Sequence, residues 1–284
     1  MAAQGSRSAA RDEGVRLALW PMLDDREGRW ASAHNVSEFE RFVRGMLDPL
    51  GREGTLPDEL AIDLEPPFGV VSRVFSRLRD PRREGARTWL PGGSLRDARA
   101  QFHALIEDLH ARAVAVSAAV MPMVLLDATE GARGGWQRLL GTPVDRLPWD
   151  HVSAMLYTSI FEGWSLGVVR RDDARSVLAT LCRRAAERYG ATAGVSLGAV
   201  STGALGDEPV FRSPDELADD VAVAHACGLD ALTLFDLGGV LRRPPAEAWL
   251  EAFTAPPRAL SGLPHTARGS LVTRLGAGVG RIPW

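Results

Sequence analysis

Short apolar runs of β-forming residues alternate with longer stretches of helical periodicity along most of this chain of 284 residues. Such alternation is typical of βα units, in which helices connect the parallel strands of one sheet. Six runs have the composition of strands, and they span residues 15–23, 60–65, 113–126, 152–159, 193–200 and 230–237. The pattern therefore predicts an α/β protein built on parallel strands.

Capping residues and periodicity mark the helices between these strands. Polar residues that commonly cap helices precede four periodic runs: Ser37, Ser94, Asp172 and Ser213. The run after Ser213 also begins with Pro214, which is favoured at a first helical position. Gly190 and Gly228 end two of the runs, where glycine is a common C-cap. A further helix is expected directly after Pro245.

The (β/α)8 TIM barrel is the closed architecture that such a series of units predicts. It requires eight strands, whereas the sequence marks six βα units clearly, so the N-terminal strands are expected to be incomplete. No low-complexity linker interrupts the pattern. We therefore expect a flexible segment at residues 1–14 and one barrel-like domain at 15–284. An open doubly wound sheet is the alternative, although no glycine-rich phosphate loop follows the first strand.

Charge and residue usage exclude several classes of function. The net charge is only -3 and no block of like charge occurs, so a nucleic-acid partner is not expected. All 33 basic residues are arginine, which excludes lysine Schiff-base chemistry and the P-loop. Cys182 and Cys227 lie far apart in helix-like runs, and no histidine pair has metal-ligand spacing. No cofactor and no metal are expected.

The N-terminal segment and the apolar runs bear on the location of the protein. Residues 1–14 are polar and contain no apolar stretch of signal-peptide length, and no later run approaches the length of a membrane span. The chain as written is therefore expected to be cytoplasmic and without a membrane partner. An upstream start would change this expectation to export. The oligomeric state is left open.

Two carboxylates end an apolar run in the stretch "LPDELAIDLEPPFG". Asp63 and Glu65 are two residues apart, so in a strand their side chains point the same way, together with Ala61. In a barrel, the last inward-facing strand residues open onto the C-terminal rim, where active sites of this fold lie. The pair is thus a candidate for acid and base chemistry. The structural alternative is that both acids simply turn into solvent before the prolines.

Two short motifs resemble those of the family 18 glycoside hydrolases, which are chitinase-like barrels. The stretch "DELAIDLE" is similar to the Asp-x-x-Asp-x-Asp-x-Glu motif at the end of the fourth strand in that family. The stretch "AMLYTS", with Met155 and Tyr157, resembles the Met-x-Tyr-Asp motif on the sixth strand. The strand order agrees, because one strand separates the two motifs here as well. The resemblance implies a TIM barrel that acts on a glycan or oligosaccharide.

The resemblance also implies a role for each of three residues. Glu65 would protonate the leaving glycosidic oxygen and later act as the base for water. Asp63 would support the acetamido group of an N-acetylated substrate as that group attacks the anomeric carbon, and Tyr157 would hydrogen-bond to the same group. This substrate-assisted route is an exception to the usual two-carboxylate scheme. It needs Glu65 protonated near neutral pH, and a nearby negative Asp63 would raise the pKa of Glu65.

Three departures from the family pattern favour an alternative function. Ala61 and Thr158 stand where the family has aspartates, and the Ser-x-Gly-Gly pattern is absent from "LWPML". These changes are typical of a non-catalytic carbohydrate-binding or scaffold protein on the same fold. A third hypothesis is a barrel enzyme of unrelated chemistry in which Asp63, Glu65 and Asp236 hold a divalent ion.

Five further residues are candidates for contact with the glycan: Trp20, Trp30, Met155, Trp164 and Asp236. The tryptophans lie at or after strand ends, where flat rings can stack on sugars, although packing in the core is the more common role of a single tryptophan. The loop 28–35 combines an aromatic ring with His34 and Asn35, a mixture that suits a ligand rim. Asp236 ends the last strand, and a turn-forming aspartate is the alternative explanation there.

Overall fold

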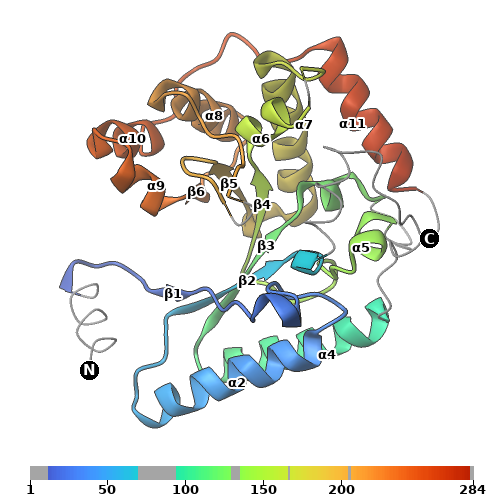
Figure 1. Ribbon diagram of the computed structural model, residues 1–284, viewed down its shortest axis with the longest axis vertical. Helices are drawn as coiled ribbons and strands as arrows, with labels where there is room; N and C mark the ends of the chain where they lie inside the picture. The colour runs from blue at the N-terminus through green and yellow to red at the C-terminus, as the bar shows by residue number, and fades with distance from the viewer. Residues whose placement is uncertain (1–11, 70–93, 129–134, 166, 204–205, 282–284) are drawn as a thin grey trace. The chain divides into compact units, whose positions relative to one another are not determined.

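The computed structural model describes residues 12–69, 94–128, 135–165, 167–203 and 206–281. The chain divides into two compact units (Figure 1). Unit 1 comprises Met1–Val120 and Gln137–His151, and unit 2 comprises Met121–Trp136 and Val152–Trp284. The predicted flexible segment at 1–14 lies mostly outside the described residues, and a single domain over 15–284 stays a prediction.

Unit 1 is built on three parallel strands, β1 (Ala18–Leu19), β2 (Glu59–Leu64) and β3 (Ala115–Val120). β2 pairs in parallel with β1 on one side and with β3 on the other. The alternating pattern predicted a first strand over 15–23, but β1 has two residues. Pro21 has no backbone N–H for a ladder, so the strand stops before it.

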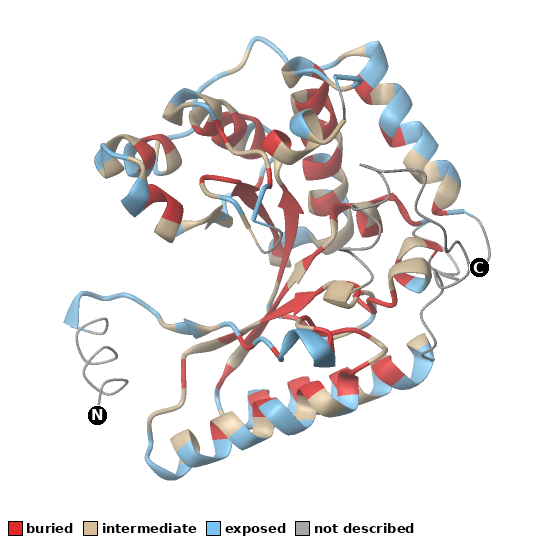
Figure 2. Cartoon of the chain, in the orientation of Figure 1, coloured by how far each residue is buried: buried red, intermediate tan, exposed pale blue. Residues whose placement is uncertain are grey.

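Two long helices pack side by side in unit 1, α2 (Val36–Arg52) and α4 (Leu95–Ala111) (Figure 1). Each buries apolar residues at helical spacing along one face, and the opposite face is exposed (Figure 2). The rings of Phe39 and Phe102 meet between the helices with centroids 6.5 Å apart. Ser94 caps α4 as predicted, because its hydroxyl accepts a hydrogen bond from the Asp97 amide at 3.2 Å. A short helix η1 (Asp25–Glu27) precedes α2.

Unit 2 carries the parallel strands β4 (His151–Leu156), β5 (Ala193–Gly198) and β6 (Leu232–Phe235). Every residue of β5 is buried, as expected for a central strand covered on both faces. The helices α7 (Arg171–Tyr189) and α8 (Pro214–Ala226) pack against β5 and against each other. The other helical segments of unit 2 are η2 (Pro122–Leu126), α6 (Thr158–Gly163), η3 (Gly190–Thr192), α9 (Leu237–Arg242), α10 (Ala246–Phe253) and α11 (Ala267–Val279). The helix α5 (Gly135–Leu140) begins in unit 2, and from Gln137 on it belongs to unit 1.

The described residues thus confirm an α/β architecture with six strands, and within them eight strands are not found. Apart from the run at 60–65, every predicted strand was too long. The run at 113–126 bends into η2 at Pro122, which has no N–H for a ladder but is well suited to a first helical position. The run at 152–159 ends at Leu156, and α6 begins at Thr158.

The helix α11 was not predicted. Its sequence contains three glycines, whose weak helix propensity hides the pattern. The Thr266 hydroxyl caps its start by accepting a hydrogen bond from the Gly269 amide at 2.9 Å. Packing against α7 supplies the stability that local propensity does not.

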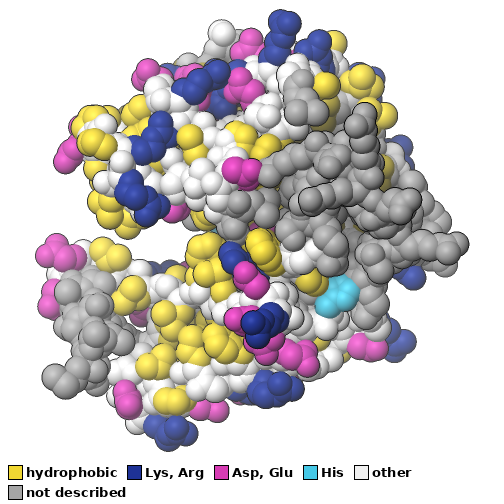
Figure 3. Space-filling view, viewed as in Figure 1, with side chains coloured by type: hydrophobic (Ala, Val, Ile, Leu, Met, Phe, Trp, Pro, Cys, Tyr) yellow, Lys and Arg dark blue, Asp and Glu magenta, His cyan; other side chains and the backbone are white. Residues whose placement is uncertain are grey.

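Charged side chains of both signs are interspersed over the face seen in Figure 3, as the net charge of -3 indicates. Among the described residues, no helix is long and apolar enough to cross a membrane.

Candidate carboxylate site

The predicted acid pair lies where β2 ends in unit 1. Asp63 is the fifth residue of the strand and is 3% exposed, whereas Glu65 follows the strand and is half-buried. The carbonyl of Asp63 accepts a hydrogen bond from the Ala31 amide at 2.9 Å, and Ala31 forms a parallel bridge with Leu64. The loop before α2 therefore runs directly alongside the acids.

The two carboxyl groups share a hydrogen bond. Burial raises the pKa of Asp63 to about 7, while hydrogen bonds from Glu65 and from Trp20 act in the opposite direction. A hydrogen bond between two carboxyl groups requires one proton, so the pair holds a proton close to neutral pH. Oδ1 of Asp63 has no hydrogen-bond partner among the described residues.

Asp58, the first acid of the motif, has a different role. Its Oδ2 accepts a hydrogen bond from the Leu17 amide at 2.8 Å, which ties the start of β2 to the segment that enters β1. Asp58 precedes the strand, while Asp63 lies near its end, so the two acids do not belong to one site. Ala61 pairs in register with Ser117 on β3.

Asn35 organises the loop at 28–35, which the sequence singled out. Its Oδ1 accepts from the amide and the hydroxyl of Ser32, at 2.9 and 3.0 Å. Its Nδ2 donates to the carbonyls of Glu27 and Trp30, both at 2.8 Å. The loop is also joined to the segment after β2, because the Phe68 amide donates to the Gly28 carbonyl at 3.0 Å.

Three side chains stack beside this loop. The rings of Trp30 and Phe68 meet edge to face with centroids 5.6 Å apart, and the Arg29 guanidinium lies 4.4 Å from the Phe68 centroid. Trp30 is 6% exposed, so its ring packs inside the unit, which is the alternative that the sequence left open. Trp20 is 47% exposed and hydrogen-bonds to Asp63, so it joins an open aromatic surface to the acids.

In unit 2, the second predicted motif spans the end of β4, with Met155 in the strand and Tyr157 after it. Met155 is 9% exposed, and the Tyr157 ring stacks on Phe235 with centroids 5.1 Å apart and planes 17° apart. Gly198 on the intervening strand makes room for this stack. A Cβ atom there would lie 3.2 Å from the Tyr157 ring and 2.6 Å from the Phe235 carbonyl oxygen.

Thr158 belongs to a buried ionic network. Its Oγ1 donates to Asp220 and accepts from Arg171 Nη1 at 2.8 Å. Asp220 is fully buried and also pairs with Arg171 and Arg175, at 3.4 and 3.5 Å. Burial raises the pKa of Asp220 to about 6, and the two arginines and Thr158 counteract that rise. Thr158 therefore stabilises the packing of α6, α7 and α8.

Asp236 and Trp164 lie at helix ends in unit 2. Oδ1 of Asp236 caps α9 by accepting from the Gly239 amide at 3.1 Å, and it also accepts from the Ser201 hydroxyl at 2.6 Å. This is the local role that the sequence offered as the alternative. Trp164 is half-buried at the C-terminal end of α6.

The structure thus brings Asp63, Glu65 and Trp20 together within unit 1. Tyr157 belongs to unit 2, so its convergence with the acids stays a prediction. Sequence reasoning missed Arg29 and Phe68, whose contact arises from the fold of the loop and has no spacing signal. Within the described ranges, no group of three or more His, Cys, Asp or Glu side chains is placed to hold a metal ion.

Among the solved structures that comparison with known proteins returns are two of low sequence identity. The first is the PgaB (BpsB) glycoside hydrolase domain from Bordetella bronchiseptica, with 14% identity over 76% of this chain and a TM-score of 0.48. This chain covers 62% of the length of that domain. The second is a chitinase from Chromobacterium violaceum ATCC 12472, with 12% identity, coverage of 88% of this chain and 83% of that one, and a TM-score of 0.38.

Neither a family model nor a curated protein matches this chain. At identities of 12–14% and TM-scores below 0.5, the two structural likenesses assign no reaction and no site residue. The likeness to family 18 therefore remains a resemblance of motifs.

Proposed function

We propose that this protein acts on a glycan, with an N-acetylated sugar at the scissile bond, by acid and base catalysis from Glu65. The observation that carries the proposal is the hydrogen-bonded pair of Asp63 and Glu65 at the end of β2, with Asp63 buried and its pKa raised to about 7. Perturbed carboxyl groups that share one proton are characteristic of sites that transfer protons.

The pair can supply both protonation states that glycosidic cleavage needs. Burial favours the neutral form of Asp63, and the hydrogen bond from Glu65 favours the ionised form. The proton therefore has a direct path between the two groups. With the proton on Glu65, this residue donates it to the leaving oxygen, and the ionised Asp63 supports the acetamido group of the substrate. After departure of the leaving group, Glu65 acts as base toward water.

Substrate recognition would use the open ring of Trp20. Its exposed face suits stacking on a sugar, while its hydrogen bond to Asp63 fixes the ring next to the acids. The loop 28–35 forms the neighbouring wall, because it runs alongside the end of β2. A sugar stacked on Trp20 would lie close to the proton that the pair shares.

The central test is Glu65→Gln, assayed on chitin-like and peptidoglycan-like oligosaccharides. We expect turnover to fall by about 10²–10⁴-fold, because general acid and base catalysis contributes that much. Binding of the oligosaccharide, measured by calorimetry, should persist because the amide keeps the shape of the side chain.

Glu59→Gln is the matched control, because Glu59 begins the same strand, at the end opposite Glu65, and its ion pair with Arg16 is long at 3.8 Å. This variant should cleave at the wild-type rate. Full activity of the Glu65→Gln protein would refute the catalytic assignment.

A second candidate function is binding of carbohydrate without cleavage. Thr158 stands where the family motif has an acid, and its hydroxyl is buried and hydrogen-bonded to Asp220 and Arg171. Ala61 removes another acid of the motif. Under this alternative, the wild-type protein binds the oligosaccharides, no reducing ends appear, and Trp20→Ala abolishes the binding.

A further inference from the structure

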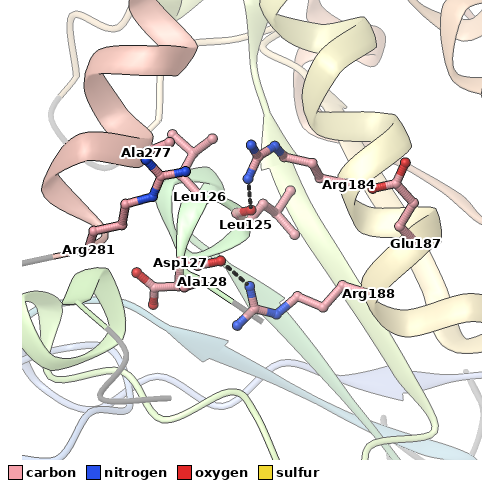
Figure 4. Close-up of a pocket in the computed structure, with 9 residues that line it drawn as sticks. All are labelled: Leu125, Leu126, Asp127, Ala128, Arg184, Glu187, Arg188, Ala277 and Arg281. Atoms are coloured by element: carbon pink, nitrogen blue, oxygen red, sulfur yellow. Dashed lines mark hydrogen bonds between the residues drawn. The ribbon is translucent and has the colours of Figure 1, made fainter. Parts of the chain in front are cut away.

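Unit 2 contains a pocket of about 450 Å³ that is separate from the acid pair and is lined by three arginines. Arg184 and Arg188 come from α7, and Arg281 follows the end of α11 (Figure 4). The floor is the segment that ends η2, at residues 125–128. No residue predicted to act in glycan chemistry lines this pocket.

Glycines bring α11 within backbone distance of η2. A Cβ atom at Gly276 would lie 2.5 Å from Leu126 Cδ1, and one at Gly280 would lie 2.6 Å from the Leu126 carbonyl oxygen. At Gly280 the contact is with backbone, so only glycine permits this approach, and the indole of Trp136 fixes it by donating to the Gly276 carbonyl at 2.8 Å. The close contact holds Arg281 at the edge of the pocket.

Backbone carbonyls orient the two arginines of α7, which lie one helical turn apart. Nη1 of Arg184 donates to the Leu125 carbonyl at 3.2 Å (Figure 4). Nη1 of Arg188 donates to the carbonyls of Asp127 and Val124, at 3.1 and 3.2 Å. Each bond uses one amino group of a guanidinium that has five N–H donors. The two side chains are therefore fixed in position. Arg184 retains further N–H donors that can bind a ligand.

The lining carries an excess of positive charge. Three arginines face two acids, Asp127 and Glu187. Asp127 Oδ1 accepts a hydrogen bond from the Trp136 amide at 2.6 Å, and Glu187 is exposed. Within the described residues, neither Arg184 nor Arg281 forms an ion pair with a carboxylate. Contact with η2 explains the hydrogen bond from Arg184 to the Leu125 carbonyl, but it does not explain why Arg281 lines the pocket.

We propose that this pocket binds a phosphate group, either as the free ion or as the ester of a small molecule. Guanidinium groups donate pairs of parallel N–H bonds that match phosphate oxygens, and several arginines on different elements suit a tetrahedral anion. The volume lies within the range of small-molecule sites, so it accommodates an ester as well as the ion.

The test is calorimetric titration with inorganic phosphate, glucose 6-phosphate and neutral glucose at one fixed, low ionic strength. We expect saturable binding of a phosphate-bearing probe and none of glucose. Arg184→Gln and Arg281→Gln should each weaken this binding about tenfold, as loss of a charged hydrogen bond predicts. Arg183→Gln is the control, because its exposed side chain lies on the same helix and does not line the pocket.

Arg281→Gln protects the test against loss of folding, since Arg281 is exposed and its side chain has no hydrogen bond in the described structure. Tighter binding of glucose 6-phosphate than of phosphate would indicate that the natural ligand is an ester, and equal binding would indicate the free ion. Either result would support the site. Absence of saturable binding, or undiminished binding in both pocket variants, would overturn the proposal. Cleavage of glycans should be unchanged in Arg281→Gln, so this result is independent of the proposed function.

Discussion

Two aspartates in this molecule are similarly buried but have different partners for their carboxyl groups. Asp63 in unit 1 and Asp220 in unit 2 are 3% and 0% exposed, and burial raises the pKa of both, to about 7 and about 6. Asp220 is compensated by two arginines and a threonine. Asp63 has a second carboxyl group and an indole as its partners.

The comparison separates a structural acid from one suited to chemistry. Beside arginines, a buried carboxylate remains ionised at neutral pH and its charge belongs to the fold. Beside another carboxyl group, a buried acid shares a proton that leaves or returns near neutral pH. The partner, rather than the depth of burial, therefore decides which role the carboxyl group takes.

The largest expected effect comes from breaking the compensated site. Asp220→Ala removes the fully buried carboxylate that both Arg171 and Arg175 contact, and leaves them Glu216 and Asp219 as ion-pair partners. We therefore expect the free energy of unfolding to fall by about 3–5 kcal/mol. Urea denaturation followed by circular dichroism measures this loss.

The neighbouring Asp219→Ala is the control, because Asp219 is 35% exposed and pairs with Arg175 and Arg258 at the surface. Its loss should lower the stability by at most about 1 kcal/mol. Equal losses in the two variants would show that Asp220 carries no special structural charge.

The next effect is a pH dependence that belongs to Asp63. Its pKa rises from about 4 in the unfolded chain to about 7 in the folded one, so the folded state binds more protons between these values. The contribution of Asp63 to the free energy of unfolding therefore falls as the pH rises from about 4 to about 7. Asp63→Asn removes this loss, and across that window it should gain up to about 4 kcal/mol relative to the wild type.

Urea denaturation at a series of pH values measures this gain. Asp220 titrates in both proteins, so its contribution cancels from the difference. A difference in stability that stays constant from pH 4 to pH 7 would contradict a raised pKa at Asp63.

The smallest effect concerns the indole partner. Trp20→Phe removes a hydrogen bond that favours the ionised form of Asp63, so the pKa of Asp63 should rise further. The stability change should be about 1 kcal/mol, because Trp20 is half-exposed and loses one hydrogen bond. The pH-dependent fall in stability should extend to higher pH. In the Asp63→Asn background the same substitution should leave the pH profile unmoved, which a double-mutant cycle measures.

The fold could be predicted from the sequence wherever local pattern and packing agree. Periodicity and the polar residues at their starts located α4, α7 and α8 to within a residue or two, although of the three polar residues only Ser94 forms a side-chain cap. The lengths of strands could not be predicted, because β1 and β3 end at prolines that sit inside continuous apolar runs. The helix α11 was missed because tertiary contacts with α7 outweigh the poor propensity of its glycines.

In the candidate site, too, local spacing could be predicted and long-range contacts could not. The two-residue spacing of Asp63 and Glu65 predicted a shared direction, and the two side chains are hydrogen-bonded. The sequence indicated that Thr158 replaces an acid of the family motif. Its partner Asp220 is 62 residues away in the chain, so no local pattern could predict the buried network. The pKa of Asp63 depends likewise on burial by residues from other elements.

Asn35 has a consequence for the thermodynamics of binding. All four hydrogen-bonding positions of its amide side chain are occupied within the loop, by Ser32, Glu27 and Trp30. A wall that is already ordered loses little conformational entropy when a ligand arrives. Asn35 thus shifts the entropic cost of ordering this wall from the moment of binding to the moment of folding.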